Sequence, residues 1–479
     1  MTIEQLAAIQ SRRRFLKKCG AGISTAAFAN LLSAEGYSTD SSKLPRVNPM
    51  APRRPHFAPK AKNIILMYQS GAPSQLDLFD PKPGLSKWNG ESLPPSLTKD
   101  LKLAFIKPNA KIMASPYKFK RYGQSGMEFS ELVPHLGTCA DDICMIRTMN
   151  TEAFNHDPGV LMLTTGHTQF GRPSIGSWVA YGLGSESQNL PGFVVLGSGK
   201  GPNGGSNIWG NGFLPSAYQG TRFRTTGDPI LYLANNEGVS RELQRSRLDV
   251  IRKLNEKRYE ETGDLEIAAR INSYELAFRM QIAAPGLLDF SDEPQHILDA
   301  YGAEKEPTQA FGTNCLLARR MVERGVRFVM LNHGDWDAHQ KIDENHRENC
   351  SMVDQPAAAL IKDLKQRGLL DSTLVIWSAE FGRTPMIQLD RPDAGAGRDH
   401  HPDCYSLWLA GGGIKPGTIL GETDDIGLKT VQDKVHVHDL QATVLHCLGF
   451  DHEKLTFHHE GRDFRLTDVG GTVIDSILL

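Results

Sequence analysis

The chain has 479 residues, with 53 lysines and arginines against 55 aspartates and glutamates, and its formal net charge is −2. This balance argues against a nucleic-acid-binding protein, which presents a strongly basic face. Beyond the N-terminal region, no segment approaches the roughly 20 apolar residues that a membrane-spanning helix needs, so we expect no stable membrane span.

The N-terminus reads as an export signal. Residues 11–17 (Ser-Arg-Arg-Arg-Phe-Leu-Lys) precede a mildly apolar stretch at 20–32, and this combination matches a twin-arginine signal peptide. We therefore predict that residues 1–34 are a signal read by the twin-arginine translocase, which gives a periplasmic or extracellular location. The alternative is an ordinary basic amphipathic N-terminus. Residues 35–60 are rich in Ser, Pro and Arg and are predicted to be a linker.

Six cysteines follow the signal. An oxidising compartment permits disulfides, but none of the spacings matches a zinc ribbon or a C-x-x-C redox pair. For Cys139 and Cys144, a disulfide and two buried free thiols are both open alternatives.

The first half of the folded region mixes strands, loops and helices. The continuous apolar runs at 64–68 and 193–196 are typical of strands buried on both faces. Residues 198–226 are rich in Gly and Asn and predict a long surface loop of the kind that often forms the wall of an enzyme site. The charged segment around 240–301 has helical periodicity and predicts a helical insertion of two or three helices.

The second half alternates helices with strands. The predicted helices span 308–324, 352–367 and 439–449, and the predicted strands span 327–331, 373–377 and 405–409. This alternation indicates an α/β fold over residues 61–479, with a doubly wound, mainly parallel sheet and helices on both faces.

Polar clusters stand next to the predicted strands. Residues 332–339 follow one strand, 378–385 follow another and 397–403 precede a third, while 155–158 precede an apolar stretch. Ligands of open α/β sheets bind beyond the carboxyl ends of the strands, so these clusters are candidates for one site.

The residue types in these clusters suit a divalent metal ion. Asp and His two or four residues apart can place oxygen and imidazole ligands on one side of a turn, as zinc or manganese requires. The candidate metal ligands are Asp335, Asp337, His339, Glu380, His400 and His401. The alternative is that these side chains are helix caps, ion pairs and hydrogen-bonded core groups.

These motifs bring a resemblance to a known family. The segments Trp336-Asp337-Ala338-His339, Glu380-Phe381-Gly382-Arg383-Thr384-Pro385 and Gly397-Arg398-Asp399-His400, behind a twin-arginine leader, resemble the exported bacterial proteins of domain-of-unknown-function family 1501. Further matches at 70–77, 439–443 and 461–468 extend the resemblance over nearly the whole mature chain. The family is similar to the alkaline phosphatase-like superfamily of sulfatases, phosphatases and phosphomutases. The resemblance implies a metal-centred hydrolytic site.

The resemblance also implies roles for individual residues. One metal site would use Asp335 or Asp337 together with His339, and either His400 or His401. Glu380 and Phe381 stand where the superfamily has the Asp and His of a second metal site. Ser70 stands where it has the Asp of the first strand, with Asp77 as a substitute. The nucleophile position falls on His156.

These departures from the superfamily limit the chemistry that the resemblance implies. No Cys or Ser stands at the position that sulfatases convert to formylglycine, and the second metal site lacks the ligands that the superfamily has there. Hydrolysis would then use hydroxide made at one metal ion, or His156 as nucleophile or base. Arg383 and Arg398 are candidates for gripping an anionic ester, with structural ion pairing as the alternative.

We therefore predict an exported hydrolase that uses a divalent metal ion (zinc, manganese, calcium or magnesium). Its substrate would be a sulfate or phosphate ester, either a small molecule or an extracellular polysaccharide. The first alternative is a non-catalytic binding or surface protein that kept the fold and lost the nucleophile. The second is a metal-dependent isomerase or mutase that acts on a phosphosugar.

Overall fold

The computed structural model describes residues 48–98, 103–224, 230, 233, 235, 237–388 and 395–479. The predicted signal peptide at 1–34 and the first part of the predicted linker lie outside these residues. Within the described ranges, no helix is both long and apolar enough to cross a membrane.

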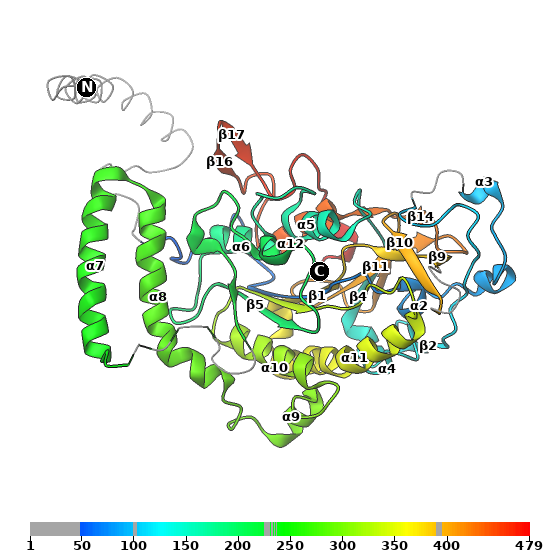
Figure 1. Cartoon of the computed structure of the whole chain (residues 1–479), viewed down its shortest axis with the longest axis horizontal. Coiled ribbons are helices and arrows are strands. Elements are labelled where there is room, and N and C mark those ends of the chain that lie inside the picture. Colours follow the sequence, from blue (N-terminus) through cyan, green and yellow to red (C-terminus); the bar gives the residue numbers. More distant parts are fainter. Residues whose placement is uncertain are drawn as a thin grey trace.

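A nine-stranded sheet forms the centre of the molecule (Figure 1), in the order β12-β4-β11-β8-β1-β7-β5-β6, with β15 also paired to β4. The strands are β1 (Asn63–Gln69), β4 (Ile143–Asn150), β5 (Phe193–Ser198), β6 (Thr221–Arg222), β7 (Phe328–His333), β8 (Thr373–Ser378), β11 (Tyr405–Ala410), β12 (Thr418–Leu420) and β15 (Val435–His436). The five predicted strands coincide with β1, β5, β7, β8 and β11, each to within two residues at either end. They were recognisable because β1, β7, β8 and β11 are buried along their whole length and therefore largely apolar.

Strand β11 runs opposite to the rest of the sheet. It pairs antiparallel with β8 and β4, whereas β1 pairs parallel with β7 and β8, and β7 pairs parallel with β5. The N-terminal end of β11 therefore lies at the same edge as the C-terminal ends of the parallel strands. Residues that precede β11 can meet residues that follow β7 and β8 at this carboxyl edge.

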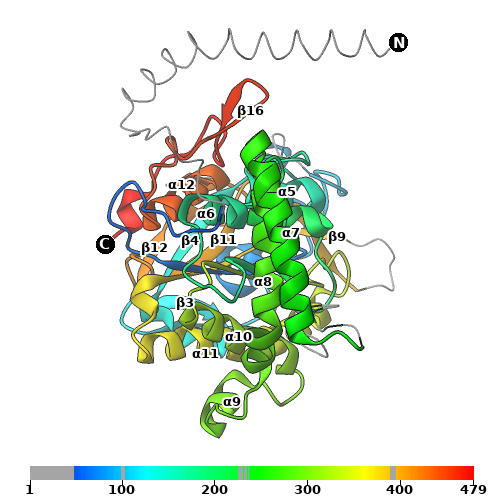
Figure 2. The ribbon, with the colours of Figure 1, turned by 90° about the vertical axis from the view of Figure 1, so that its left-hand side faces the viewer.

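Helices cover both faces of the sheet (Figures 1 and 2). One face packs against α4 (Pro134–Gly137), α10 (Gln309–Glu323) and α11 (Ile342–Gln366), and the other against α5 (His156–Thr165), α6 (Ile175–Leu183) and α12 (Val437–Cys447). A separate hydrophobic core fills each of the two interfaces. The predicted α/β fold with a mainly parallel sheet is thereby confirmed.

Helix α5 is held firmly at its C-terminal end. Gly166 caps the helix with a φ of 70°, and a Cβ at this position would lie 1.8 Å from the carbonyl oxygen of Leu466, so only glycine fits. Gln441 of α12 donates hydrogen bonds to the carbonyls of Met162 and Leu163 in the last turn of the helix. These contacts fix the opposite end of α5, where His156 begins the helix.

The predicted helical insertion consists of α7 (Arg241–Thr262), α8 (Leu265–Leu288) and α9 (Gln295–Tyr301). Figure 1 shows α7 and α8 side by side as a hairpin at one end of the molecule. Tyr259 of α7 packs with Ile267, Ala268 and Ile271 of α8 in a small core of its own.

Three segments differ from the predictions. Helix α11 begins ten residues earlier than predicted, because its first turns are polar and carry little apolar periodicity. The polar clusters on either side of residues 389–394, for which no secondary structure was predicted, form two paired strands, β9 (Gly382–Gln388) and β10 (Gly397–His401). The described part of the segment predicted as a surface loop, 198–224, is more than a loop, since it buries Trp209 and Tyr218 and contains β6.

The remaining short elements are α2 (Gln75–Leu78), α3 (Pro95–Thr98), β2 (Phe119–Tyr122), β3 (Met127–Ser130), β13 (Glu422–Thr423), β14 (Thr430–Gln432), β16 (Phe457–His459) and β17 (Arg462–Phe464). All six cysteines of the described chain are buried free thiols, so Cys139 and Cys144 are not joined to each other.

Candidate metal centre

Four predicted residues converge at the carboxyl edge of the sheet. His156, Asp337, His339 and His400 each offer one ligand atom, and these atoms all lie within 4.8 Å of one another. His156 is the first residue of α5, and His400 lies on β10, shortly before β11. Asp337 and His339 lie in the loop between β7 and α11. The cluster therefore depends on the antiparallel direction of β11.

The side chains meet around one carboxylate oxygen. Asp337 Oδ1 lies 3.0 Å from Nε2 of His339, 3.1 Å from Nε2 of His156 and 3.6 Å from Nε2 of His400. The Nε2 atoms of His339 and His400 are themselves only 3.0 Å apart. The three imidazoles thus present the same nitrogen to one small space.

The other ring nitrogen of each histidine faces an acceptor. Nδ1 of His156 lies 2.6 Å from Glu380 Oε1, Nδ1 of His339 lies 2.5 Å from Gln388 Oε1, and Nδ1 of His400 lies 2.7 Å from the carbonyl oxygen of Phe154. An oxygen acceptor keeps the imidazole proton on Nδ1, and the Nε2 lone pair is then free to bind a metal. Metal-ligating histidines are normally fixed in this way.

This geometry fits a bound cation. Two Nε2 lone pairs at 3.0 Å repel each other unless a proton or a metal ion lies between them. Nε2 of His156 is buried and is not aligned for a hydrogen bond, despite its proximity to Asp337. Three imidazole nitrogens and one carboxylate oxygen form a donor set that suits zinc or another transition metal.

Glu380 lies behind His156. It is fully buried, its Oε1 accepts hydrogen bonds from His156 Nδ1 and from the backbone N–H of Gly71 (2.9 Å), and its Oε2 accepts one from the Tyr68 hydroxyl (2.9 Å). We predicted Glu380 as a metal ligand. In the structure Glu380 is not among the four clustered residues but contacts one of them, His156, whose ring it orients.

Arg383 lies beside Asp337 and is fully buried. Its Nη2 donates to Asp337 Oδ1 at 2.6 Å and to the carbonyl of Gly71, and its Nε and Nη1 donate to the carbonyls of Ala72 and Arg398. The protein therefore occupies four of its five N–H groups. This arrangement holds Asp337 in place and leaves little capacity for gripping an ester.

The structure does not bring four predicted residues to the cluster. Arg398 is buried in a two-pronged ion pair with Asp77, at 2.8 and 3.2 Å, which also removes Asp77 as a substitute ligand. His401 lies next to His400 on β10, and since adjacent strand residues point to opposite sides, its Nε2 instead contacts Cys404 Sγ at 3.2 Å. Asp335 has a φ of 85° and belongs to the turn that leads into the loop, outside the ligand group.

Two phenylalanines lie next to the cluster: Phe381, which the resemblance placed at a former ligand position, and Phe105, for which the sequence carries no signal. The ring of Phe381 lies 5.0 Å from the ring of His156 and 4.6 Å from that of His400. Phe105 packs edge-on against His339 and His400 at 5.3 and 5.4 Å, although the residue is 62% exposed. These rings form apolar walls around the histidines.

The charges of the cluster shift the pKa values of its members. Burial alone would lower the pKa of His156, but the carboxylates of Asp337 and Glu380 raise it to about 9. Burial lowers the pKa of His400 to about 4. Burial would raise the pKa of Asp337, but the three histidines and Arg383 hold it well below its usual range. Without a metal ion, the protonated ring of His156 lies between the carboxylates of Asp337 and Glu380.

Comparisons with known proteins match one family model and several solved structures. A family model described as "Protein of unknown function (DUF1501)" matches residues 61–478. No curated protein matches the chain. One similar solved structure is Ps i-CgsB in complex with k-i-k-neocarrahexaose, at 13% identity over 81% of this chain and 72% of that chain, with a TM-score of 0.35. The PsFucS1 sulfatase from Pseudoalteromonas sp. is similar at 11% identity over 82% of this chain and 68% of that chain, with a TM-score of 0.34. The phosphonate monoester hydrolase SpPMH from Silicibacter pomeroyi is similar at 13% identity over 66% of this chain and 68% of that chain, with a TM-score of 0.30. At these values each similarity is remote.

Proposed function

The chain belongs to the DUF1501 family, and from its histidine–carboxylate cluster we propose that it is an exported hydrolase that uses one divalent metal ion to cleave sulfate or phosphate esters. The observation that carries this proposal is the convergence of three Nε2 atoms, each with its Nδ1 on an oxygen acceptor, around Asp337 Oδ1. The proposed location is the periplasm or the cell exterior, and sulfated or phosphorylated polysaccharides are the proposed natural substrates.

The donor set favours zinc or manganese over calcium or magnesium. Calcium and magnesium prefer sites made of oxygen ligands, whereas this cluster supplies three nitrogens and one carboxylate. When bound, such an ion acidifies water and polarises an ester oxygen. The four ligands would be His156, Asp337, His339 and His400.

His156 is better suited to hold the metal than to attack the substrate. Its Nδ1 is held by Glu380, and its Nε2 faces the other ligands. Neither nitrogen is therefore free to act as nucleophile or base once a metal ion is bound. This leaves water as the proposed nucleophile and makes Glu380 a positioning residue.

Substrate access and charge fit an anionic ester. The Asp337 side chain is 42% exposed, whereas that of His400 is 1% exposed, so the centre opens on the Asp337 side. Helix α5 begins at His156, and the N-terminal end of a helix favours negative charge nearby. An incoming sulfate or phosphate group would therefore meet a favourable electrostatic field.

The test is metal content followed by turnover. Full-length protein, purified without chelator, should carry one equivalent of metal, and His339→Ala and His400→Ala should lose it. His401→Ala is the matched control, because its side chain lies on the same strand but points away from the cluster, and it should retain the metal. The metal-loaded protein should then hydrolyse aryl sulfates or phosphates. Absence of metal in the wild type would refute the proposal, and bound metal without turnover would favour a binding protein.

A further inference from the structure

A small cavity lies at the carboxyl end of β5. It has a volume of about 70 Å³, and its lining includes Gly197, Lys200, Trp209, Arg222 and Asn332. We call this cavity the β5 pocket. It lies under the glycine-rich segment that the sequence predicted to form the wall of a site.

The cavity exists because β5 carries no side chain at Gly197. Gly197, Asn332 and Tyr68 are in register across β5, β7 and β1, so they face the same side of the sheet. Tyr68 fills the space above its own strand, whereas Gly197 leaves the space beside Asn332 open. A Cβ on Gly197 would meet nothing nearer than the Asn332 carbonyl oxygen at 3.9 Å, and the backbone of Gly197 is not left-handed.

Asn332 is buried without a partner. It is 3% exposed, its Oδ1 is fully buried, and its side chain forms no hydrogen bond with any described residue. Buried polar side chains are almost always hydrogen-bonded, so an orphaned amide that lines a cavity indicates a missing partner. Oδ1 can only accept and needs a donor, but Nδ2 of the same amide also forms no hydrogen bond with any described residue, and it is the atom that can donate to an oxyanion.

The charges around this amide are positive and unneutralised. Lys200 and Arg222 line the same cavity, both are exposed, and neither forms an ion pair with a residue in the described part of the chain. Ammonium and guanidinium groups beside a buried amide select an anion, and guanidinium matches the geometry of sulfate, phosphate and carboxylate.

Hydrogen bonds between neighbouring residues link the surroundings of the β5 pocket to those of the metal centre. Tyr68, in the same row of residues, donates to Glu380, which in turn orients His156. Gly204, in the segment that covers the pocket, donates its N–H to Asp157 Oδ1 at 2.8 Å. Asp157 follows His156 in the first turn of α5. The pocket and the metal centre therefore share one face and one edge of the sheet.

We propose that the β5 pocket is a second oxyanion site, which binds an acidic group of the substrate other than the ester being cleaved. Its role toward substrate rests on the proposed function. The natural substrate would then carry at least two acidic groups, as a sulfated or phosphorylated polysaccharide does. Sulfate, phosphate and carboxylate share the required chemistry.

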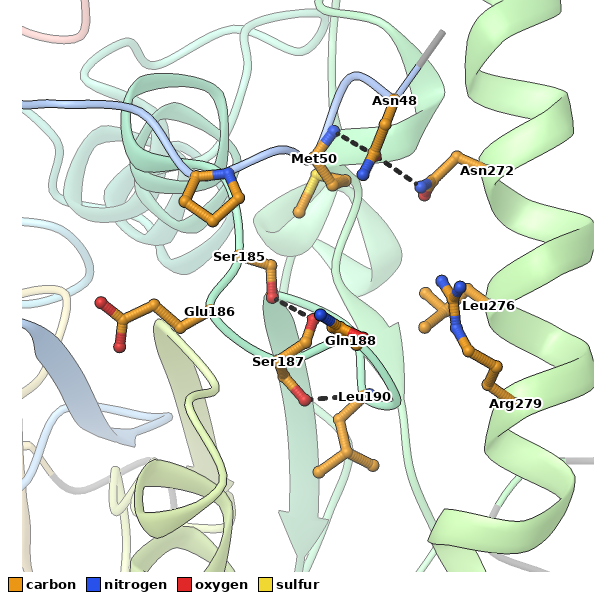
Figure 3. A pocket seen from close by; sticks show the side chains of 12 residues that line it. Asn48, Met50, Ser185, Glu186, Ser187, Gln188, Leu190, Asn272, Leu276 and Arg279 are labelled. Carbon is orange, nitrogen blue, oxygen red and sulfur yellow. Dashed lines mark hydrogen bonds between the residues drawn. The ribbon is translucent and has the colours of Figure 1, made fainter. Parts of the chain in front are cut away.

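A second cavity provides a matched control. It lies near the opposite end of β5, between α8 and the segment around residues 185–192 (Figure 3), and its lining includes Arg279. Like Arg222, Arg279 forms no ion pair with any described residue, and its Nε has no hydrogen-bond partner. This cavity is remote from the carboxyl edge, so neutralising Arg279 tests the effect of charge alone.

The experiment is calorimetric titration of full-length protein with inorganic phosphate, sulfate and acetate in separate runs, which identifies the preferred oxyanion. Wild type should show two sites. Gly197→Val, which fills the cavity and keeps every charge, should lose one of them. Arg222→Gln should weaken the same site about tenfold, the effect of about one charge-assisted contact. Arg279→Gln should match the wild type.

The outcomes separate this inference from the proposed function. His339→Ala should keep the β5 site and lose the metal-dependent site. If Gly197→Val and Arg222→Gln bind all three anions as the wild type does, or if Arg279→Gln is weakened equally, the β5 pocket is not an oxyanion site. If only the metal-dependent site is missing from the wild type, the proposed function fails and the pocket stands. If no anion binds at all, both are wrong.

Discussion

Metal binding should release a proton, and this reaction tests the geometry of the centre directly. In the metal-free protein, Asp337 and Glu380 raise the pKa of His156 to about 9, so its Nε2 is protonated at neutral pH. A metal ion that binds this nitrogen must displace that proton. Metal affinity should therefore fall as the pH falls below about 9, because a larger fraction of the protein carries the His156 proton that the metal must displace.

The magnitude comes from the same pKa. Because pH 7 lies about two units below this pKa, displacing the proton from His156 lowers the metal affinity about a hundredfold, or by about 2.7 kcal/mol. His400 adds no proton in this range, since burial lowers its pKa to about 4. Apparent zinc affinity should therefore rise about tenfold per pH unit between pH 6 and 8.

The assay is zinc titration against a competing chelator at several pH values, with calorimetry in two buffers of different ionisation enthalpy to count the protons released. At least one proton should be released per zinc ion at pH 7. His401→Ala should behave as the wild type does, since its imidazole lies outside the cluster. Zinc affinity that stays constant from pH 6 to 8, with no proton release, would refute the assignment of His156 as a ligand.

Three further predictions concern single residues. Arg398→Met should leave Asp77 as an uncompensated buried charge and lower the free energy of unfolding by roughly 3–5 kcal/mol, measured by denaturant unfolding. The folded fraction of this variant should keep its metal. Loss of metal with normal stability would instead show that Arg398 belongs to the metal site. Gly71→Ala should reduce metal content, because Gly71 has a φ of 108° and a Cβ there would lie 2.5 Å from the backbone nitrogen of Asp337. Gly90→Ala is the control: Gly90 has a φ of 83° with open space around it, so this variant should bind metal normally. Equal metal content in the two variants would contradict the prediction. Phe105→Ala should speed metal loss to a chelator severalfold with little change in melting temperature, since its exposed ring covers two histidines, and an unchanged rate would mean that the ring shields nothing.

The sheet could be predicted because burial leaves a local signature. Strands such as β1, β7 and β8 are buried on both faces, so they read as apolar runs whatever surrounds them. The β9–β10 ribbon carries no such signature: it buries Arg383 and Arg398, whose charges are satisfied only by partners far away in the chain. A buried strand that carries charged residues lacks the apolar run by which the other strands were predicted.

The candidate site could be predicted in composition but not in detail. Because ligands of α/β sheets bind at the carboxyl ends of strands, the sequence predicted that the clusters containing His156, Asp337, His339 and His400 form one site. Choosing His400 over His401 required the knowledge that both lie on a strand, where neighbours point in opposite directions. The role of Arg398 required its pairing with Asp77, which stands 321 positions earlier in the chain.

The hydrogen bond between His400 and the Phe154 carbonyl joins residues 246 positions apart. Closing so long a stretch of chain is entropically costly and happens only when most of the sheet has formed. A growing chain on the ribosome therefore cannot assemble the ligand set until nearly all of it has emerged. Capture of the proposed metal ion would then be among the last steps of maturation, and the ion would stabilise the finished fold without directing its folding.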